Sequence, residues 1–268
     1  MRKLILVLLL LVMSAGLIAC AGGDEKAKEI FTKAYEAAEE MQSAEVSINM
    51  NQQITIGDSA MDISTDMEGE VIADPMALHQ KGKMTMNMDE TPMEMEMEMY
   101  LADNEFYMYD GMMGQWFKVD QSMMDLYTNQ QELADQLEMF EDYVGDFSLE
   151  EADGHYQLQL TMDSKAVGEM FDSIIADYMP EDMLEALGEE GTKLLDSMEV
   201  THLFYELTVD KNTYETKEYR MEIETTMDVD GEEMKISIDM NGTYDNINGI
   251  DKIEIPAEVK EQAIEQPF

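Results

Sequence analysis

Methionine and glutamate alternate within residues 83–109, and these two residue types carry the chemistry that the sequence offers. From Met93 to Met99 every second residue is methionine, and every residue between them is glutamate. Three more methionines keep this spacing just before the run: Met84, Met86 and Met88. Thioether sulfurs are soft ligands that suit Cu(I), whereas carboxylate oxygens suit Ca²⁺. Methionines at this spacing also offer a third possibility, an adaptable apolar surface.

The spacing of two residues favours the apolar surface. Successive side chains of a β-strand point to opposite faces, so a strand here has one methionine face and one acidic face. The sulfurs then share the face that packs on a core or lines a cavity. Histidine, the commonest metal ligand, occurs three times in the whole chain. We therefore predict a core or cavity lining rather than a copper site, and no cofactor.

A second candidate metal site lies near residue 230. Asp228, Asp230 and Glu233 have part of the spacing of a calcium-binding loop, but the twelve-residue frame and its final glutamate are missing. Asp230-Gly231 is instead a strong signal for a two-residue hairpin turn. We interpret this segment as a turn and predict no metal.

Charge and motifs exclude several classes of function. Of 268 residues, 60 are acidic and 16 are basic, which gives a formal net charge of −44. Such a charge repels nucleic acid, so nucleic-acid binding is excluded. The 45% of hydrophobic residues argues against a disordered acidic chain. The sequence lacks His-Glu-x-x-His, Gly-x-Ser-x-Gly and a phosphate-binding glycine loop, and we predict that the protein is not an enzyme.

Residues 1–19 are organised like a secretory signal peptide. Arg2-Lys3 forms a short basic start, and the apolar run 4–12 is too short to span a membrane as a helix. Residues 17–20, Leu-Ile-Ala-Cys, closely resemble the lipobox of bacterial lipoproteins, in which the cysteine is acylated and becomes the mature N-terminus. Cys20 is the sole cysteine. We predict lipidation at Cys20, a tether at residues 20–23 and anchoring to the outer face of the bacterial cell membrane.

Hydrophobic periodicity predicts a single α+β domain over residues 24–268. A helical stripe covers residues 24–42. Strand-like alternation follows from residue 46 to residue 119, with turns at Gly57-Asp58, Asp74-Pro75, Thr91-Pro92 and Asp103-Asn104. Helical segments are predicted at 122–141, 164–180, 183–187 and 194–198. Further strands are predicted at 147–151, 156–162, 203–209, 219–229, 234–244 and 253–259. We expect a large curved antiparallel sheet, a half-barrel, with helices covering its concave face.

This order of elements resembles that of the LolA/LppX-like bacterial lipoproteins, and in particular an uncharacterised branch from Gram-positive bacteria. The resemblance rests on the lipobox, the two meanders around central helices, the turn Val209-Asp210-Lys211-x-Thr213-Tyr214 and the terminal Ile-Pro-Ala-Glu-Val. In that group a half-barrel with a helical lid encloses a hydrophobic cavity, and known members carry lipids or the acyl chains of lipoproteins. The resemblance implies the same fold and a hydrophobic ligand for this chain.

The sequence and the resemblance together predict a membrane-anchored protein that binds an acyl chain or lipid between sheet and helices. The predicted cavity lining comes from two apolar surfaces, one on the strands and one on the central helix: Met84, Met86, Met93, Met95, Met97, Met99, Val167, Phe171 and Ile174. Two alternatives remain open. One is a structural or interaction module with a filled core, and the other is a methionine-based binder of soft metals. The sequence does not indicate an oligomeric state.

Overall fold

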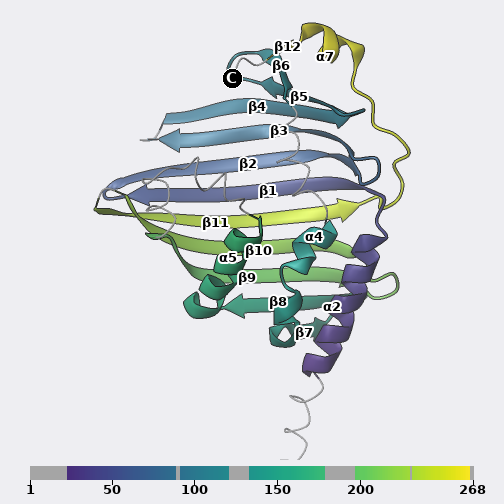
Figure 1. Ribbon diagram of the computed structural model, residues 1–268, viewed down its shortest axis with the longest axis vertical. Coiled ribbons are helices and arrows are strands. Elements are labelled where there is room, and N and C mark those ends of the chain that lie inside the picture. The colour runs from purple at the N-terminus through teal and green to yellow at the C-terminus, as the bar shows by residue number, and fades with distance from the viewer. Residues whose placement is uncertain (1–22, 89–90, 121–132, 179–196, 230, 266–268) are drawn as a thin grey trace, which may run out of the picture.

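A large, open and curved antiparallel sheet forms the body of the protein. The computed structural model describes residues 23–88, 91–120, 133–178, 197–229 and 231–265. Within them, twelve strands form one sheet in the order β12-β6-β5-β4-β3-β2-β1-β11-β10-β9-β8-β7 (Figure 1). Neighbouring strands are antiparallel except for β12 and β6, which are parallel. The large antiparallel sheet expected from the sequence is confirmed.

The strands have the following bounds: β1 Ser43–Ile56, β2 Ser59–Ile72, β3 Ala77–Met88, β4 Thr91–Ala102, β5 Glu105–Asp110, β6 Gln115–Val119, β7 Ser148–Glu151, β8 His155–Met162, β9 Glu199–Asp210, β10 Thr216–Val229, β11 Glu232–Asp245 and β12 Ile264–Glu265. Strands β1 to β6 and strands β9 to β11 form two meanders, which join where β1 pairs with β11. One sheet therefore contains strands from both halves of the chain.

Alternation of residue types sorts the side chains onto two faces of the sheet. The face that carries the methionines of β4 is apolar, whereas the opposite face of β4 carries Glu94, Glu96 and Glu98. Between β4 and β5, Asp103 and Asn104 both have positive φ values, 52° and 63°. These values are typical of a two-residue hairpin turn, and the predicted turn at this position is confirmed. Thr91 and Pro92 are both part of β4, so the break predicted at Thr91-Pro92 is wrong.

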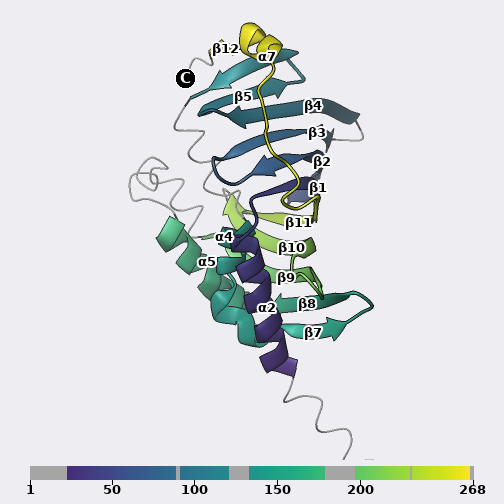
Figure 2. The same cartoon turned by 90° about the vertical axis from the view of Figure 1, so that its right-hand side faces the viewer.

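All described helices except the C-terminal one gather beside one half of the sheet. Helix α2 (Gly23–Glu39), helix α4 (Leu133–Glu138), the 3₁₀ segment η1 (Glu141–Asp146) and helix α5 (Ser164–Tyr178) lie beside strands β7 to β10, as Figure 2 shows. Helix α5 contacts β8 and β9, and α2 contacts β7, β8 and β10. Among the described residues, no helix is long and apolar enough to cross a membrane. These four segments therefore cover the β7–β10 part of the apolar face and reach the adjoining ends of β1 and β11.

A dense core fills the space between these helices and the sheet. The predicted stripe of α2 is buried here, with Ile30, Phe31 and Ala34 at most 2% exposed. The rings of Phe140 and Tyr205 stack with centroids 4.3 Å apart. Complete burial of such side chains contributes about 1.5–3 kcal/mol each by transfer from water. This core holds the helices to the sheet.

The C-terminal segment departs from its predicted structure. Residues 253–259 were expected to form a strand, but helix α7 (Ala257–Gln262) begins directly after Pro256. Proline lacks the backbone N–H that a strand uses and suits the start of a helix, and Glu258 and Lys260 favour the first and last turns respectively. Val259 packs against Tyr107 and Trp116 on the polar face of the sheet.

The predicted helices at 122–141 and 194–198 are described only in part, and the predicted helix at 183–187 lies outside the described residues.

Candidate ligand-binding face

The candidate site is the apolar surface of β3 and β4, called here the methionine face. It consists of six of the residues predicted from the sequence: Met84, Met86, Met93, Met95, Met97 and Met99. Antiparallel pairing places Met84 opposite Met95 and Met86 opposite Met93. Neighbouring side chains on one face of paired strands are close enough to contact one another. The structure therefore brings these six methionines together.

The methionine face continues across the sheet toward the helices. Met67 of β2 is paired with Gly82 of β3, which is in turn paired with Met97. On the next strand, Ile48 of β1 is paired both with Met67 and with Gly242 of β11. This row of apolar positions connects β4 to the strands that lie beneath the helices.

The methionine face is only partly buried. Met93 is 44% exposed, and the neighbouring Met108 of β5 is 41% exposed, whereas Leu207 and Leu158 beneath the helices are fully buried. The methionines at positions 95, 97 and 99 have intermediate exposure. Apolar side chains that remain this accessible leave surface on which another apolar molecule can bind.

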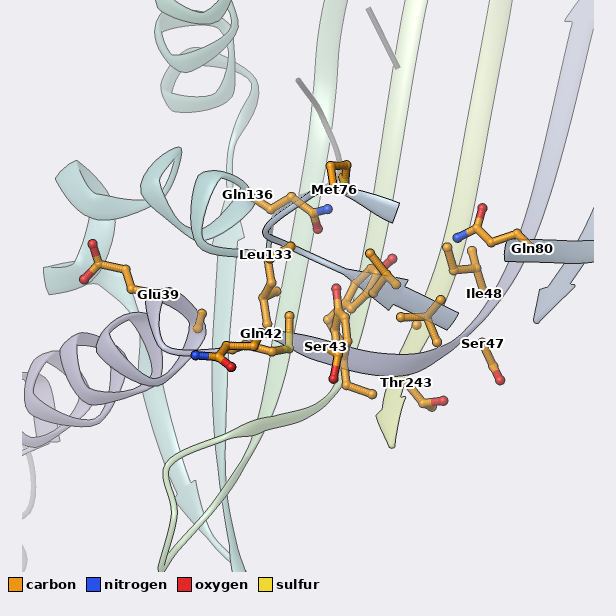
Figure 3. Close-up of a pocket in the computed structure, with 18 residues that line it drawn as sticks. Glu39, Gln42, Ser43, Ser47, Ile48, Met76, Gln80, Leu133, Gln136 and Thr243 are labelled. Atoms are coloured by element: carbon orange, nitrogen blue, oxygen red, sulfur yellow. The ribbon is translucent and has the colours of Figure 1, made fainter. Parts of the chain in front are cut away.

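A cavity of about 100 Å³ lies where this surface meets the helices. Its lining combines the end of α2, residues of α4 and the adjacent strands: Ala38, Glu39, Met41, Gln42, Ser43, Val46, Ser47, Ile48, Val71, Ala73, Met76, Gln80, Leu133, Gln136, Tyr219, Gly242, Thr243 and Tyr244. Figure 3 shows Glu39 at one end of the cavity, Ile48 and Gln80 at the other, and Ser43 between them. Several of these residues are polar, although they lie on the apolar side of the sheet.

Buried polar atoms accompany this apolar surface. Thr65 of β2 lies between Met50 of β1 and Met84 of β3 and is 7% exposed. Its hydroxyl has no hydrogen-bond partner among the residues that the structure describes.

Two tyrosines in the wall of the cavity are also largely buried. Burial raises the pKa of the Tyr219 and Tyr244 hydroxyls, because an ionised phenolate loses hydration in this environment.

The helical part of the predicted lining lies elsewhere. Val167 of α5 is 1% exposed and belongs to the core beneath the helices, against which Phe171 also packs. Ile174 lies in α5, but its side chain is outside the described residues. Strands β3, β2, β1, β11 and β10 separate β4 from β9, which α5 contacts. The structure thus does not place Val167 and Phe171 opposite the methionines.

Sequence reasoning did not single out the residues that shape the cavity. In the sequence, Tyr219, Tyr244 and Gln80 lie in segments predicted as strands, and nothing in the local pattern distinguishes them or Gly242 from their neighbours. A weak signal was present, because a glycine inside a strand often marks a position where a neighbouring ring crosses the backbone. The partner of that glycine depends on strand pairing, which the local sequence does not show.

The opposite, polar face offers a different environment. A groove of about 680 Å³ there is lined by charged residues, including Glu68, Lys81, Lys83 and Glu96. Both lysines are paired, Lys81 with Glu68 at 3.3 Å and Lys83 with Glu94 at 2.9 Å. Within the described ranges, no group of three or more His, Cys, Asp or Glu side chains is arranged to hold a metal ion. The groove therefore has no cation left unpaired to attract an anion.

Two solved structures have a backbone path similar to that of this chain. LprF from Mycobacterium bovis has 16% sequence identity and a TM-score of 0.43, with 88% of this chain and 99% of that chain covered. The Mycobacterium tuberculosis lipoprotein LppX has 11% identity and a TM-score of 0.41, with 86% and 100% covered.

No curated protein matches the chain. One family model does, and it extends from residue 26 to residue 264. That range includes most of α2, both meanders, α7 and the first residue of β12. The chain therefore belongs to the family of unknown function DUF6612.

Proposed function

We propose that this protein is a lipid-anchored, extracytoplasmic binding protein without enzymatic activity. It would hold the hydrocarbon chain of a lipid or acyl compound against the methionine face. The observation that carries the proposal is the partial exposure of this face and of the adjoining position on β5. Met93 is 44% exposed, and Met108, which is paired with Met99, is 41% exposed. Flexible thioether side chains adapt to apolar ligands of varied shape.

The energetics favour such a ligand. Each methylene group removed from water contributes about 0.8 kcal/mol, so a long acyl chain gains several kcal/mol even when it is covered on one side. The cavity of about 100 Å³ is smaller than the roughly 300–1,000 Å³ of ordinary ligand pockets. The chain of the ligand would therefore lie mostly along the methionine face, with the cavity receiving one end.

The anchor belongs to the same proposal. Cys20 lies outside the described residues, and its lipidation rests on the sequence Leu-Ile-Ala-Cys at 17–20. Helix α2 begins at Gly23, so residues 20–23 would join the lipid directly to the first helix. With 60 acidic residues in the chain, a covalent lipid holds it at a membrane where charge attraction would not.

The proposal is tested by binding of diphenylhexatriene, a fluorescent hydrocarbon that contains no oxygen. The chain from residue 20 onward is used, with Cys20→Ser so that it carries no lipid. We expect saturable binding, and we expect Met97→Glu to weaken it by about tenfold or more, because a carboxylate in the centre of the face must be desolvated. The matched control is Met112→Glu in the β5–β6 turn, where the side chain is 63% exposed. Equal affinities for both variants would contradict the proposal.

A second candidate is an interaction module whose methionine face is covered by a partner protein. The dense core beneath the helices and the small cavity favour this alternative. This alternative predicts that the unmodified chain shows no saturable binding of diphenylhexatriene.

A further inference from the structure

The cavity beside the helices has an unusually polar lining for its place on an apolar face. Amide and hydroxyl groups are contributed by the segment between α2 and β1 and by β1, β3, α4, β10 and β11: Gln42, Ser43, Gln80, Gln136, Tyr219 and Tyr244. Gln80 and Ser43 are only 5% and 3% exposed. Figure 3 shows Gln42, Ser43 and Gln136 around the same space. A cavity built for the methyl end of a hydrocarbon chain would instead be lined by aliphatic side chains.

Two tyrosines in this lining are largely buried, and no described residue provides a hydrogen bond to either hydroxyl. Tyr219 and Tyr244 are 6% and 7% exposed, and their ring centroids are 6.0 Å apart. Neither hydroxyl makes a side-chain hydrogen bond to any residue in the described part of the chain. A buried tyrosine hydroxyl usually finds a hydrogen-bond partner, because leaving it without one costs free energy. Both hydroxyls are thus available as donors to a bound group.

The charge of the lining limits what that group can be. Among the described residues that line the cavity, Glu39 is the one charged side chain, and it is negative. A carboxylate or phosphate placed there would lose hydration and gain no cationic partner. The formal net charge of −44 adds repulsion over the whole molecule. A neutral head group that accepts hydrogen bonds needs no cationic partner and is not repelled by the net negative charge.

The cavity is also continuous with the methionine face. Ile48 and Gln80 line it, and strand pairing places Ile48 opposite Met67 and Gln80 opposite Met99. Its volume of about 100 Å³ equals roughly three water molecules at about 30 Å³ each. That is enough for a small head group but not for a whole lipid.

We propose that this cavity binds the neutral, oxygen-bearing head of a single-chain lipid, such as a monoacylglycerol or a long-chain alcohol. The hydroxyls of Tyr219 and Tyr244 donate hydrogen bonds to the oxygens of the head, and the hydrocarbon chain extends over the methionine face. This inference rests on the proposed function and specifies the class of ligand.

The test compares two ligands that share one hydrocarbon chain. Oleate and 1-monooleoylglycerol displace diphenylhexatriene from the unlipidated chain at pH 9, below their micellar concentrations. Oleate is then ionised, while burial raises the pKa of both tyrosines and keeps them protonated. We expect monooleoylglycerol to bind about tenfold more tightly or better. The double variant Tyr219→Phe, Tyr244→Phe should lose roughly three- to tenfold of that affinity and keep its affinity for diphenylhexatriene.

Two further variants make the test specific. Tyr107→Phe is the matched control, because Tyr107 is also buried but packs against Trp116 and Val259 on the other face. It should leave both ligands unaffected. Gln42→Lys places a cation beside the cavity at an exposed position and should raise the affinity for oleate by several-fold.

The outcomes separate the two proposals. Absence of diphenylhexatriene binding contradicts the proposed function itself. Binding of that probe together with equal or tighter binding of oleate overturns the neutral-head inference alone. A preference for monooleoylglycerol that survives both Tyr→Phe changes and Gln42→Lys shows that the head lies elsewhere, and it overturns the assignment to this cavity.

Discussion

The ring of Tyr219 occupies the space that a side chain at Gly242 would need. The two residues are directly paired across β10 and β11, and a Cβ atom at Gly242 would lie 2.0 Å from Cε1 of Tyr219. A glycine in a strand interior ordinarily weakens the sheet, but here it admits an aromatic ring over the backbone. This contact fixes Tyr219 in the wall of the cavity.

Gly242→Ala is therefore expected to destabilise the protein by about 1–3 kcal/mol, because the ring must move out of a packed position. Urea denaturation followed by circular dichroism measures the change. The control is Gly168→Ala in α5, where an added Cβ would meet no atom within 4 Å. That change should stabilise the protein by about 0.5–1 kcal/mol through helix propensity. A Gly242→Ala protein as stable as the unmodified one would refute the packing argument.

Glu105 links the C-terminal helix to the sheet. Its carboxylate accepts hydrogen bonds from Lys118 at 2.6 Å and from Lys260 of α7 at 2.5 Å, and these contacts lower its pKa from 4.5 to about 2. A carboxyl group whose pKa is lowered on folding contributes stability above its unfolded pKa and loses it as the pH falls toward the folded pKa. The stabilisation is thus complete above pH 4.5 and lost between pH 4.5 and 2.

We expect Glu105→Gln to lower the free energy of unfolding at pH 7 by about 1 kcal/mol, the magnitude of a partly exposed ion pair. The difference from the unmodified protein should shrink as the pH is lowered from 4.5 to 2. Glu254→Gln serves as the control, because Glu254 and its partner Lys252 are both exposed. It should cause no measurable change. A constant difference for Glu105→Gln down to pH 2 would rule out this ion-pair account.

The methionine face and the core should respond differently to truncation. Met97 has intermediate exposure and Leu207 is fully buried. Leu207→Ala is expected to cost about 2–5 kcal/mol, because it leaves a void in a closed core. Met97→Ala should cost about 1 kcal/mol or less, since little space is sealed there. Both values come from denaturant unfolding without added ligand, and similar losses would show that the face is packed like the core.

The lipid anchor is tested in the native host by membrane fractionation. Because Cys20 is the sole cysteine and ends the Leu-Ile-Ala-Cys stretch, Cys20→Ser should move the protein from the membrane to the soluble extracytoplasmic fraction. Ala21→Ser is the neighbouring control and should leave the distribution unchanged. Persistent membrane association of the Cys20→Ser protein would mean that attachment has another cause.

Local sequence patterns determined most of the strands and the long helices. The alternation of methionine and glutamate made β4 a strand, because side chains with a period of two separate onto two faces whatever the strand pairs with. In the same way, the stripe of Ile30, Phe31 and Ala34 specified a helix with one buried face. The Asp103-Asn104 turn followed from the tolerance of these residues for positive φ.

Tertiary structure alone decided which strands are neighbours and where the helices lie. Many strands share the same alternation, so the sequence did not show that β1 pairs with β11 or that Gly242 lies between Ile48 and Tyr219. Nor did it show that Val167 packs against the β8–β9 part of the sheet, far from β4, since any apolar stripe can cover any apolar face. Partner choice depends on contacts between residues distant in sequence. The methionine face was thus predictable from the sequence, and the cavity beside it was not.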